Sequence, residues 1–284
     1  MTALEYLPLA LLDGLASGLI LALVALGLSL AFGVMKIVNL AHGEFYMLGA
    51  VVCFLAARSG LGFWAGVLIA PLAVGLLALA VDLALLRRLE YRLSPTIVAT
   101  FGLLLVLQQA ALAIIGPAPR SVDPPLSLQL VFQGFSYSGY KILAAASATA
   151  VALGAWGLVA LSDTGLRMRA VQQNRSLAEA LGIDSGRLMT LGLMLSGALA
   201  GLAGALTAPV RQVHFLMGLD ALVWSFLVVV LGGVGRIWGT VAAAVGLGIL
   251  ESLAALFFAP TLSRVVSMLV VLAYLAARRL SWHG

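Results

Sequence analysis

The sequence predicts an all-α polytopic membrane protein with about eight to nine transmembrane or re-entrant helices and a short cytoplasmic helix. Hydrophobic residues make up 63% of the chain and charged residues only 10%, whereas soluble domains contain roughly half apolar and a quarter charged residues. Mean hydropathy is +1.13, and apolar runs of about 20 residues, enough to cross a bilayer core of about 30 Å, recur along the chain. No stretch remains for a soluble domain, so residues 1–284 are expected to form one transmembrane domain.

The apolar runs predict where the helices lie. Most are long enough to span a bilayer, but Phe45 to Ala57 and Ala221 to Leu231 are short. Because unpaired backbone groups are costly in lipid, these two are expected to be helices shielded by protein or re-entrant segments. The candidate spans, in chain order, are Leu7 to Phe32, Phe45 to Ala57, Gly62 to Leu86, Thr96 to Ile115, Tyr140 to Leu161, Leu188 to Pro209, Ala221 to Leu231, Trp238 to Phe258 and Leu262 to Ala277.

Arginines predict how the chain is oriented, because loops that stay in the cytoplasm carry an excess of basic residues. Three segments fit this rule: the loop after Leu86, the loop from Ser162 to Arg187, and the C-terminus. The proline-rich loop from Gly116 to Gly139 then falls on the outer side. The first run has no basic n-region and is too long for a signal peptide, so it is expected to be a retained helix. The arginines concerned are Arg87, Arg88, Arg92, Arg167, Arg169, Arg175, Arg187, Arg278 and Arg279.

Glycine is abundant, with 31 residues, and often recurs at four-residue spacing, as at Gly14 and Gly18. This spacing lets helix backbones approach closely in lipid, so dense helix packing is the main expectation. The regions Gly14 to Gly49 and Gly192 to Gly233 also share an order of features: a glycine-rich helix, a polar break and a short apolar run. That order indicates an internal duplication.

The loop from Ser162 to Arg187 is predicted to hold an ordered helix. Ser176 and Glu179 have the spacing of a capping box, in which each side chain satisfies a backbone donor at a helix start. Leu177 and Leu181 then share one face of that helix.

Gly182 is placed to end the same helix. A connector needs neither caps nor an apolar face, so this order favours a knob that docks into a groove on a cytoplasmic partner. The alternative is a solvated connector whose arginines only set the topology.

Polar residues interrupt the apolar sequence between the first two candidate spans, at Asn39, His42 and Glu44. Ionisable groups at membrane depth are costly and usually face a bundle interior or cavity, so these residues are candidates for a substrate path. Broken helix ends could also meet the charged groups of a zwitterion. The alternative is that the three residues only satisfy one another and the exposed backbone. Glu251 is an isolated carboxylate that either pairs with a neighbouring helix or lines the path.

Sequence motifs for catalysis are missing. The chain has no His-Glu-x-x-His zinc motif, no Gly-x-Ser-x-Gly elbow and no P-loop, and no basic patch alternates with aromatic residues for nucleic-acid binding. The chain is therefore expected to be no enzyme and to bind no metal, cofactor or nucleic acid. If transport uses ATP, another subunit must supply the energy.

Several motifs together resemble a known family. The first is Gly14 to Gly18, followed by Asn39-Leu-Ala-His-Gly-Glu44 and Met47-Leu-Gly49. The others are Thr164 to Ala170 and Gly232-Gly-Val-Gly235. These residues resemble the smaller permease subunit of bacterial branched-chain amino acid ABC importers, and the similarity extends over nearly the whole chain.

The resemblance implies an assembly in the bacterial inner membrane. Its members would be a second homologous permease, two cytoplasmic ATPases that bind ATP and magnesium, and a periplasmic substrate-binding protein. Loop 162–187 would then couple to the ATPases. The coupling candidates are Arg167, Arg169, Asn174, Ser176, Leu177, Glu179, Leu181 and Gly182.

The resemblance implies branched-chain or related hydrophobic amino acids as cargo. Two alternatives remain open. Relatives of similar sequence carry urea or short amides by the same mechanism, because much of the selectivity resides in the binding protein. A proton-coupled secondary transporter would instead use His42, Glu44 or Glu251 as a proton relay.

Overall fold

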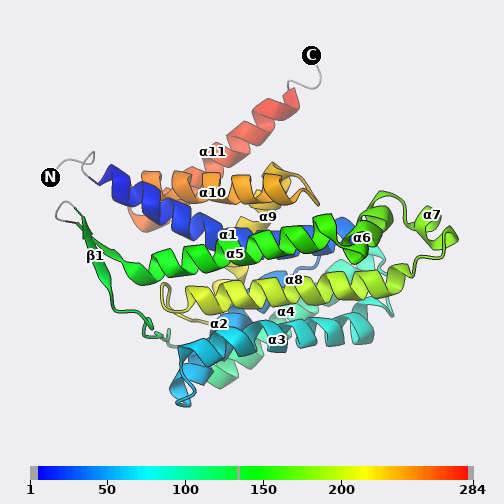
Figure 1. Cartoon of the computed structure of the whole chain (residues 1–284), viewed down its shortest axis with the longest axis horizontal. Helices are drawn as coiled ribbons and strands as arrows, with labels where there is room; N and C mark the ends of the chain where they lie inside the picture. Colours follow the sequence, from blue (N-terminus) through cyan, green and yellow to red (C-terminus); the bar gives the residue numbers. More distant parts are fainter. Residues whose placement is uncertain (1–5, 133–134, 281–284) are drawn as a thin grey trace.

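Long apolar helices dominate the computed structural model, which describes residues 6–132 and 135–280 (Figure 1). Seven helices of these residues are long and apolar enough to cross a membrane. Two shorter helices, α2 (His42–Arg58) and α9 (Met217–Gly232), match the two short runs of the sequence. The all-α polytopic fold is confirmed. The seven long helices are α1 (Leu7–Met35), α3 (Phe63–Val81) with the π-helical turn η1 (Asp82–Leu86), α4 (Leu93–Ile115), α5 (Gly139–Leu161), α8 (Ser185–Thr207), α10 (Ile237–Ala254) and α11 (Pro260–Leu280).

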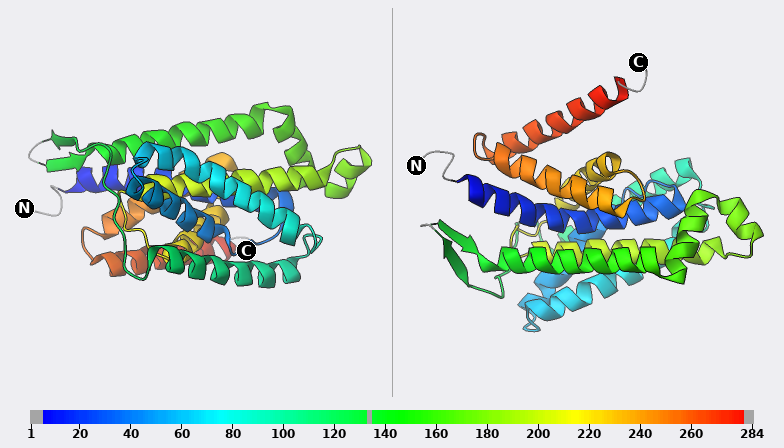
Figure 2. Two further views of the ribbon diagram at one scale, coloured as in Figure 1. Left: turned by 90° about the horizontal axis from the view of Figure 1, so that it is seen from below. Right: turned by 45° about the horizontal axis from the view of Figure 1, so that its top comes forward.

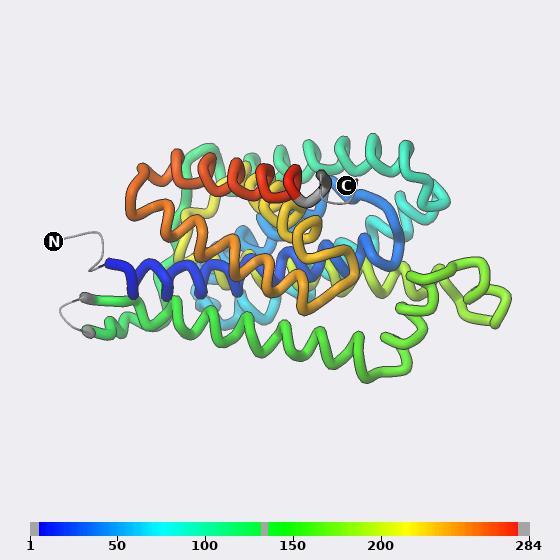
Figure 3. Tube along the Cα trace, turned by 90° about the horizontal axis from the view of Figure 1, so that it is seen from above, coloured from blue at the N-terminus to red at the C-terminus, as the bar shows by residue number. Residues whose placement is uncertain are grey.

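The two ends of the bundle carry different connections. At one end, strands β1 (Gln129–Phe132) and β2 (Phe135–Ser138) form an antiparallel hairpin beside the start of α1. At the other end, α6 (Asp163–Gln173) and α7 (Arg175–Ala180) extend beyond the long helices (Figure 3). The arginine rule predicts that the α6–α7 end is cytoplasmic and that the hairpin end faces outward.

The bundle is built from two halves with the same helix order and opposite directions. Helices α1 to α4 form the first half and α8 to α11 the second, with α5 between them. In the figures α1 runs from the outer end toward α6, whereas α8 runs back from α7 (Figures 1 and 2). Helix α1 packs against α10 as α8 packs against α3, and α2 contacts α9. This arrangement agrees with the expected duplication and is an inverted repeat.

Helices α1 and α8 form the centre. In their most apolar windows 78% and 61% of the residues are buried, against 17% in α5 and α11. Those outer helices and α3 carry many exposed leucines and valines, a pattern suited to contact with lipid tails.

Glycines set the spacing of the central helices. A Cβ atom placed on Gly14 would lie 2.6 Å from Cα of Ile249 on α10, and one on Gly27 would lie 2.7 Å from the carbonyl oxygen of Ser196 on α8. A Cβ atom on Gly49 of α2 would overlap the backbone of Gly201. The backbones therefore touch directly, as the four-residue glycine spacing predicts.

Replacing Gly49 with alanine is expected to destabilise the protein, because the added methyl group has no room against α8. Overpacking of this kind typically costs about 1–3 kcal/mol. Gly246→Ala on α10 is the matched control, since nothing lies within 4 Å of the added atom. The measurement is the temperature at which detergent-purified protein loses its monodisperse chromatographic peak. Equal temperatures for the two variants would show that the α2–α8 crossing tolerates wider spacing.

Candidate functional site

The chain breaks between α1 and α2 and turns back into the bundle. Lys36 ends α1 in the left-handed conformation, with φ at 55°, and its backbone N–H donates to the carbonyl of Phe32. The following segment is largely buried. The Asn39 side chain accepts a hydrogen bond from the backbone N–H of Ala41 at 3.0 Å. The backbone N–H of Leu40 donates to the hydroxyl of Thr100 on α4 at 3.2 Å. These bonds satisfy backbone groups that lipid could not.

His42 joins the two central helices. The side chain is 1% exposed; its Nε2 lies 2.9 Å from the carbonyl oxygen of Val24 on α1 and its Nδ1 3.2 Å from the hydroxyl of Ser196 on α8. Because a carbonyl can only accept, Nε2 carries the proton, and Nδ1 of the neutral ring accepts from the serine. Both nitrogens are occupied, so His42 holds α1, α2 and α8 together rather than presenting a free ligand.

Glu44 lies where the first turns of the two short helices meet. Its side chain is fully buried, and Oε1 accepts a hydrogen bond from the Gln108 amide on α4 at 3.0 Å. No hydrogen-bond donor among the described residues reaches Oε2. A Cβ atom on Gly218, in the first turn of α9, would lie 2.7 Å from Oε2. Glu44 is therefore enclosed by the first turns of α2 and α9, with one oxygen bonded to Gln108 and the other without a donor among the described residues.

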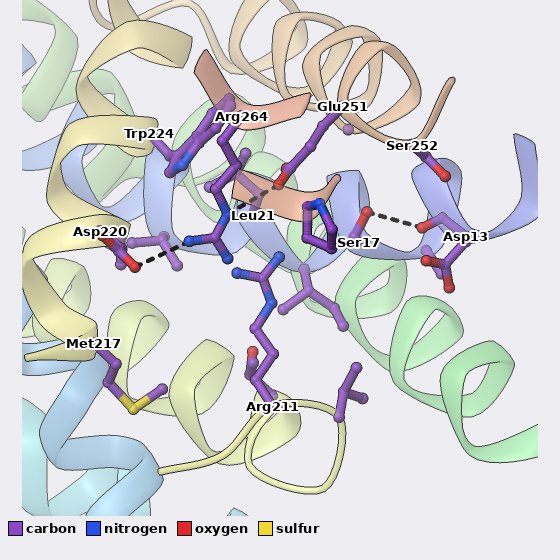
Figure 4. A pocket seen from close by; sticks show the side chains of 18 of the residues that line it. Asp13, Ser17, Leu21, Arg211, Met217, Asp220, Trp224, Glu251, Ser252 and Arg264 are labelled. Atoms are coloured by element: carbon purple, nitrogen blue, oxygen red, sulfur yellow. Dashed lines mark hydrogen bonds and ion pairs between the residues drawn. The ribbon is translucent and has the colours of Figure 1, made fainter. Parts of the chain in front are cut away.

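A cavity of about 570 Å³ opens between α1, α9, α10 and α11 on the outer side of this break (Figure 4). Its α1 wall runs from Asp13 down to Val24, the residue whose carbonyl meets His42. Tyr46, one turn beyond His42 on α2, also lines it. The layer formed by His42, Val24 and Ser196 therefore lies at the inner end of the cavity.

Charged side chains from several helices line this cavity. Arg264 on α11 lies 3.3 Å from Glu251 on α10 and 3.3 Å from Asp220 on α9, and it pairs with both (Figure 4). Lys141 at the start of α5 pairs with Asp13. The guanidinium of Arg211 has no ion-pair or hydrogen-bond partner within residues 6–132 and 135–280.

The residues that the sequence suggested for a substrate path lie in two different places. Glu251 pairs with Arg264 on the neighbouring helix α11, as one of its two expected roles requires, and it also lines the cavity; its role in a substrate path stays a prediction. Asn39, His42 and Glu44 do not line the cavity and lie in the packed layer around the helix break. Among the described residues, no group of three or more His, Cys, Asp or Glu is placed to hold a metal ion.

Helix α6 is anchored in the end of the bundle that lies opposite the β1–β2 hairpin. Ser162 caps it by accepting from the backbone N–H of Gly165 at 3.0 Å. Met168 and Val171 are buried, and the Gln172 side chain packs against Gly235 in the turn between α9 and α10. Arg167 and Arg169 lie on the exposed face.

Helix α7 begins two residues earlier than a capping box at Ser176 requires, so that prediction is wrong. Asn174 is the cap, accepting from the backbone N–H of Leu177 at 3.0 Å. Glu179 instead accepts from Ser185 and, at 2.8 Å, from Arg175. The Ser185 hydrogen bond, followed by Arg175, lowers the pKa of Glu179, so the carboxylate is charged at neutral pH.

The end of α7 agrees with the prediction. Gly182 has φ at 81°, and its N–H and that of Ile183 bond to the carbonyls of Glu179 and Ala178, which is a Schellman motif. Leu177 and Leu181 are 58% and 74% exposed. The projection formed by α7 therefore exposes two leucines that are four residues apart.

Sequence reasoning missed how α7 connects to the bundle. The Arg175 guanidinium lies 5.8 Å from the ring centre of Tyr91, and the Tyr91 hydroxyl donates to Asp82 at 3.3 Å. Asp82 also accepts from Thr190 on α8. Sequence reasoning also missed Arg211, Asp220 and Arg264. Of these, Arg264 carried a signal, because it is an ionisable residue inside a predicted span.

Asn174→Ala is expected to loosen α7, because the Leu177 N–H loses its acceptor. Losing such a cap costs about 1 kcal/mol, so tryptic cleavage at Arg175 through local unfolding should be about fivefold faster in detergent-purified protein. Ser176→Ala, at the position where the sequence placed the cap, is the control and should cleave at the original rate. Faster cleavage in the Ser176 variant alone would restore the capping box.

Known proteins of similar sequence are transport permeases. The family model described as "Branched-chain amino acid transport system / permease component" matches residues 10–275. The chain is 27% identical to the high-affinity branched-chain amino acid transport system permease protein BraD of Pseudomonas aeruginosa, over 90% of this chain and 89% of BraD. It is 28% identical to the corresponding LivH of Escherichia coli, over 92% of this chain and 90% of LivH.

A probable LivH of Methanocaldococcus jannaschii is 27% identical, over 90% of this chain and 86% of its own length. The family match covers all the helices described above except the ends of the first and last. The chain therefore belongs to the family of permease components of branched-chain amino acid transport systems.

Proposed function

We propose that this chain is the inner-membrane permease subunit of an ATP-binding cassette importer for branched-chain or related hydrophobic amino acids. A second homologous permease, two cytoplasmic ATPases that bind ATP and magnesium, and a periplasmic binding protein complete the assembly. The observation that carries the proposal is the ordered cytoplasmic projection. A capped helix that exposes Leu177 in its first turn and Leu181 at its end is suited to docking in a groove of a partner.

The anchored helix α6 gives the projection a route into the bundle. Met168 and Val171 are buried, and Gln172 packs against Gly33 near the end of α1 and against Gly235 before α10. Helices α1 and α10 both line the outer cavity. Movement of a docked ATPase would thus act directly on two walls of the cavity, while Tyr91 and Asp82 join α7 to α3.

The layer around His42 is the barrier in this mechanism. It closes the inner end of the cavity in the present conformation, since Val24 both lines the cavity and accepts the His42 hydrogen bond. Passage of cargo requires the contacts with Val24 and Ser196 to separate. Because Val24 and Phe45 beside His42 belong to the main apolar core, opening of this barrier requires α1, α2 and α8 to shift against one another.

The test is uptake of labelled leucine into liposomes that contain the complete complex, with the binding protein supplied on the outer face. ATP-dependent uptake without a proton gradient supports the proposal. Urea uptake under the same conditions would keep the mechanism and change the cargo. The apolar cavity wall that includes Leu21, Met217 and Trp224 favours a hydrophobic cargo over urea. Uptake driven by a proton gradient alone would establish the secondary transporter.

The double variant Leu177→Asp, Leu181→Asp is expected to abolish substrate-stimulated ATPase activity, because charges replace the apolar contact with the ATPase. The double variant Gln173→Asp, Ala180→Asp places the same charges on two exposed positions that are not among the coupling candidates and should retain most of the activity. ATP hydrolysis by the reconstituted complex is measured after a check that both variants fold. Normal stimulation in a folded leucine variant contradicts the docking role.

His42→Ala and Glu44→Ala are each expected to reduce leucine uptake about tenfold or more while the complex still assembles, because each removes a side chain from the barrier layer. Thr149→Ala on α5 removes a hydroxyl that bonds only to its own helix and is the control. Uptake per assembled complex is the quantity compared. Unchanged uptake in both variants would mean that the helix break has a structural role only.

A further inference from the structure

Arg211 and Arg264 face each other across the cavity (Figure 4). Arg264 pairs with Asp220 and Glu251, both at 3.3 Å, whereas no acidic side chain of the described residues pairs with Arg211. Two facing guanidinium groups repel each other, more strongly in a cavity than in bulk water. A small carboxylate between them would relieve this repulsion and could bond to either fork in bidentate fashion.

The same cavity offers acceptors for a cation. Arg264 contacts Oδ2 of Asp220 and Oε1 of Glu251, which leaves the second oxygen of each carboxylate for another donor. The other charged pair, Lys141 with Asp13, is complete in itself. An ammonium group near Glu251 and Asp220 would keep the cavity close to neutral once a carboxylate is bound beside Arg211.

Apolar side chains form the remaining wall. Leu21, Met217 and Trp224 line the cavity beside the charged groups. The volume of about 570 Å³ lies within the usual range for small-molecule sites, roughly 300–1,000 Å³. A ligand that fits this lining has a negative group, a positive group and an apolar side chain.

We propose that this cavity is a binding site for a zwitterionic α-amino acid with an apolar side chain. The carboxylate lies between Arg211 and Arg264, the ammonium group on Glu251 and Asp220, and the side chain against Leu21, Met217 and Trp224. This inference rests on the proposed function and locates the cargo within the chain. It makes the permease itself selective for zwitterions, because a ligand that lacks one of the charges leaves either Arg211 or the two carboxylates without an opposite charge from the ligand.

The test is protection of a cysteine in the cavity from chemical modification. Ser252→Cys places a thiol in the lining, and the native Cys53 is buried. The complete complex in liposomes is treated with a membrane-impermeant methanethiosulfonate in the absence of ATP. Leucine should slow labelling, whereas 4-methylpentanoate, 3-methylbutylamine and urea, each lacking one or both charges, should not.

In the Ser252→Cys background, Arg211→Gln should raise the leucine concentration needed for protection about tenfold or more. Arg211→Lys should raise it less, because lysine keeps the positive charge but cannot form the bidentate hydrogen bonds of a guanidinium group. Arg58→Gln, at the end of α2 outside the cavity, should leave it unchanged. Labelling without leucine verifies that each variant keeps the cavity open to solvent.

ATP-driven uptake in the same liposomes separates the two proposals. Uptake of leucine together with absent protection, or with protection that Arg211→Gln leaves unchanged, overturns the binding site and leaves the proposed function standing. Equal protection by 4-methylpentanoate also overturns it. Failure of leucine uptake by the unaltered complex counts against the proposed cargo, and with it against the site.

Discussion

His42 can bond to Val24 on α1 and to Ser196 on α8 only because three helices approach at backbone distance. Gly27 faces the carbonyl of Ser196, and Gly49 brings α2 against α8. Lipid tails are as apolar as the helices, so close packing and hydrogen bonds, rather than a hydrophobic drive, hold this centre together. The first turn of α2 is stable at membrane depth because the same centre shields it.

The position of this centre links the two ends of the molecule. On one side, this centre closes the charged cavity. Helices α1 and α10 line that cavity and extend to the opposite end of the bundle, where Gln172 of α6 packs against Gly33 of α1 and against Gly235 just before α10. The inverted halves place one short helix on each side of the centre. In the proposed mechanism, a displacement at α7 would reach the layer around His42 through α6 and the helices that it contacts.

Much of this arrangement follows from the sequence, for reasons that differ between its parts. Apolar length predicted the spans, and glycine spacing predicted the close packing of helices, because both depend on local sequence. The cap of α7 was misplaced because Asn174 competes with Ser176 for the same role, and Glu179 has better partners in Arg175 and Ser185. The cavity could not be predicted, since it gathers Arg211, Asp220, Glu251 and Arg264 from four elements whose contacts depend on tertiary packing.

We propose that the layer around His42 separates an outer cavity from the cytoplasm and opens during transport. The decisive experiment places a cysteine at Ser196, which is fully buried here, and measures its reactivity toward impermeant thiol reagents in a complex that still transports. We expect an unreactive thiol in the resting complex and a reactive one when ATP is bound or trapped during hydrolysis. A thiol that stays unreactive in every nucleotide state while leucine is transported would show that this layer does not open.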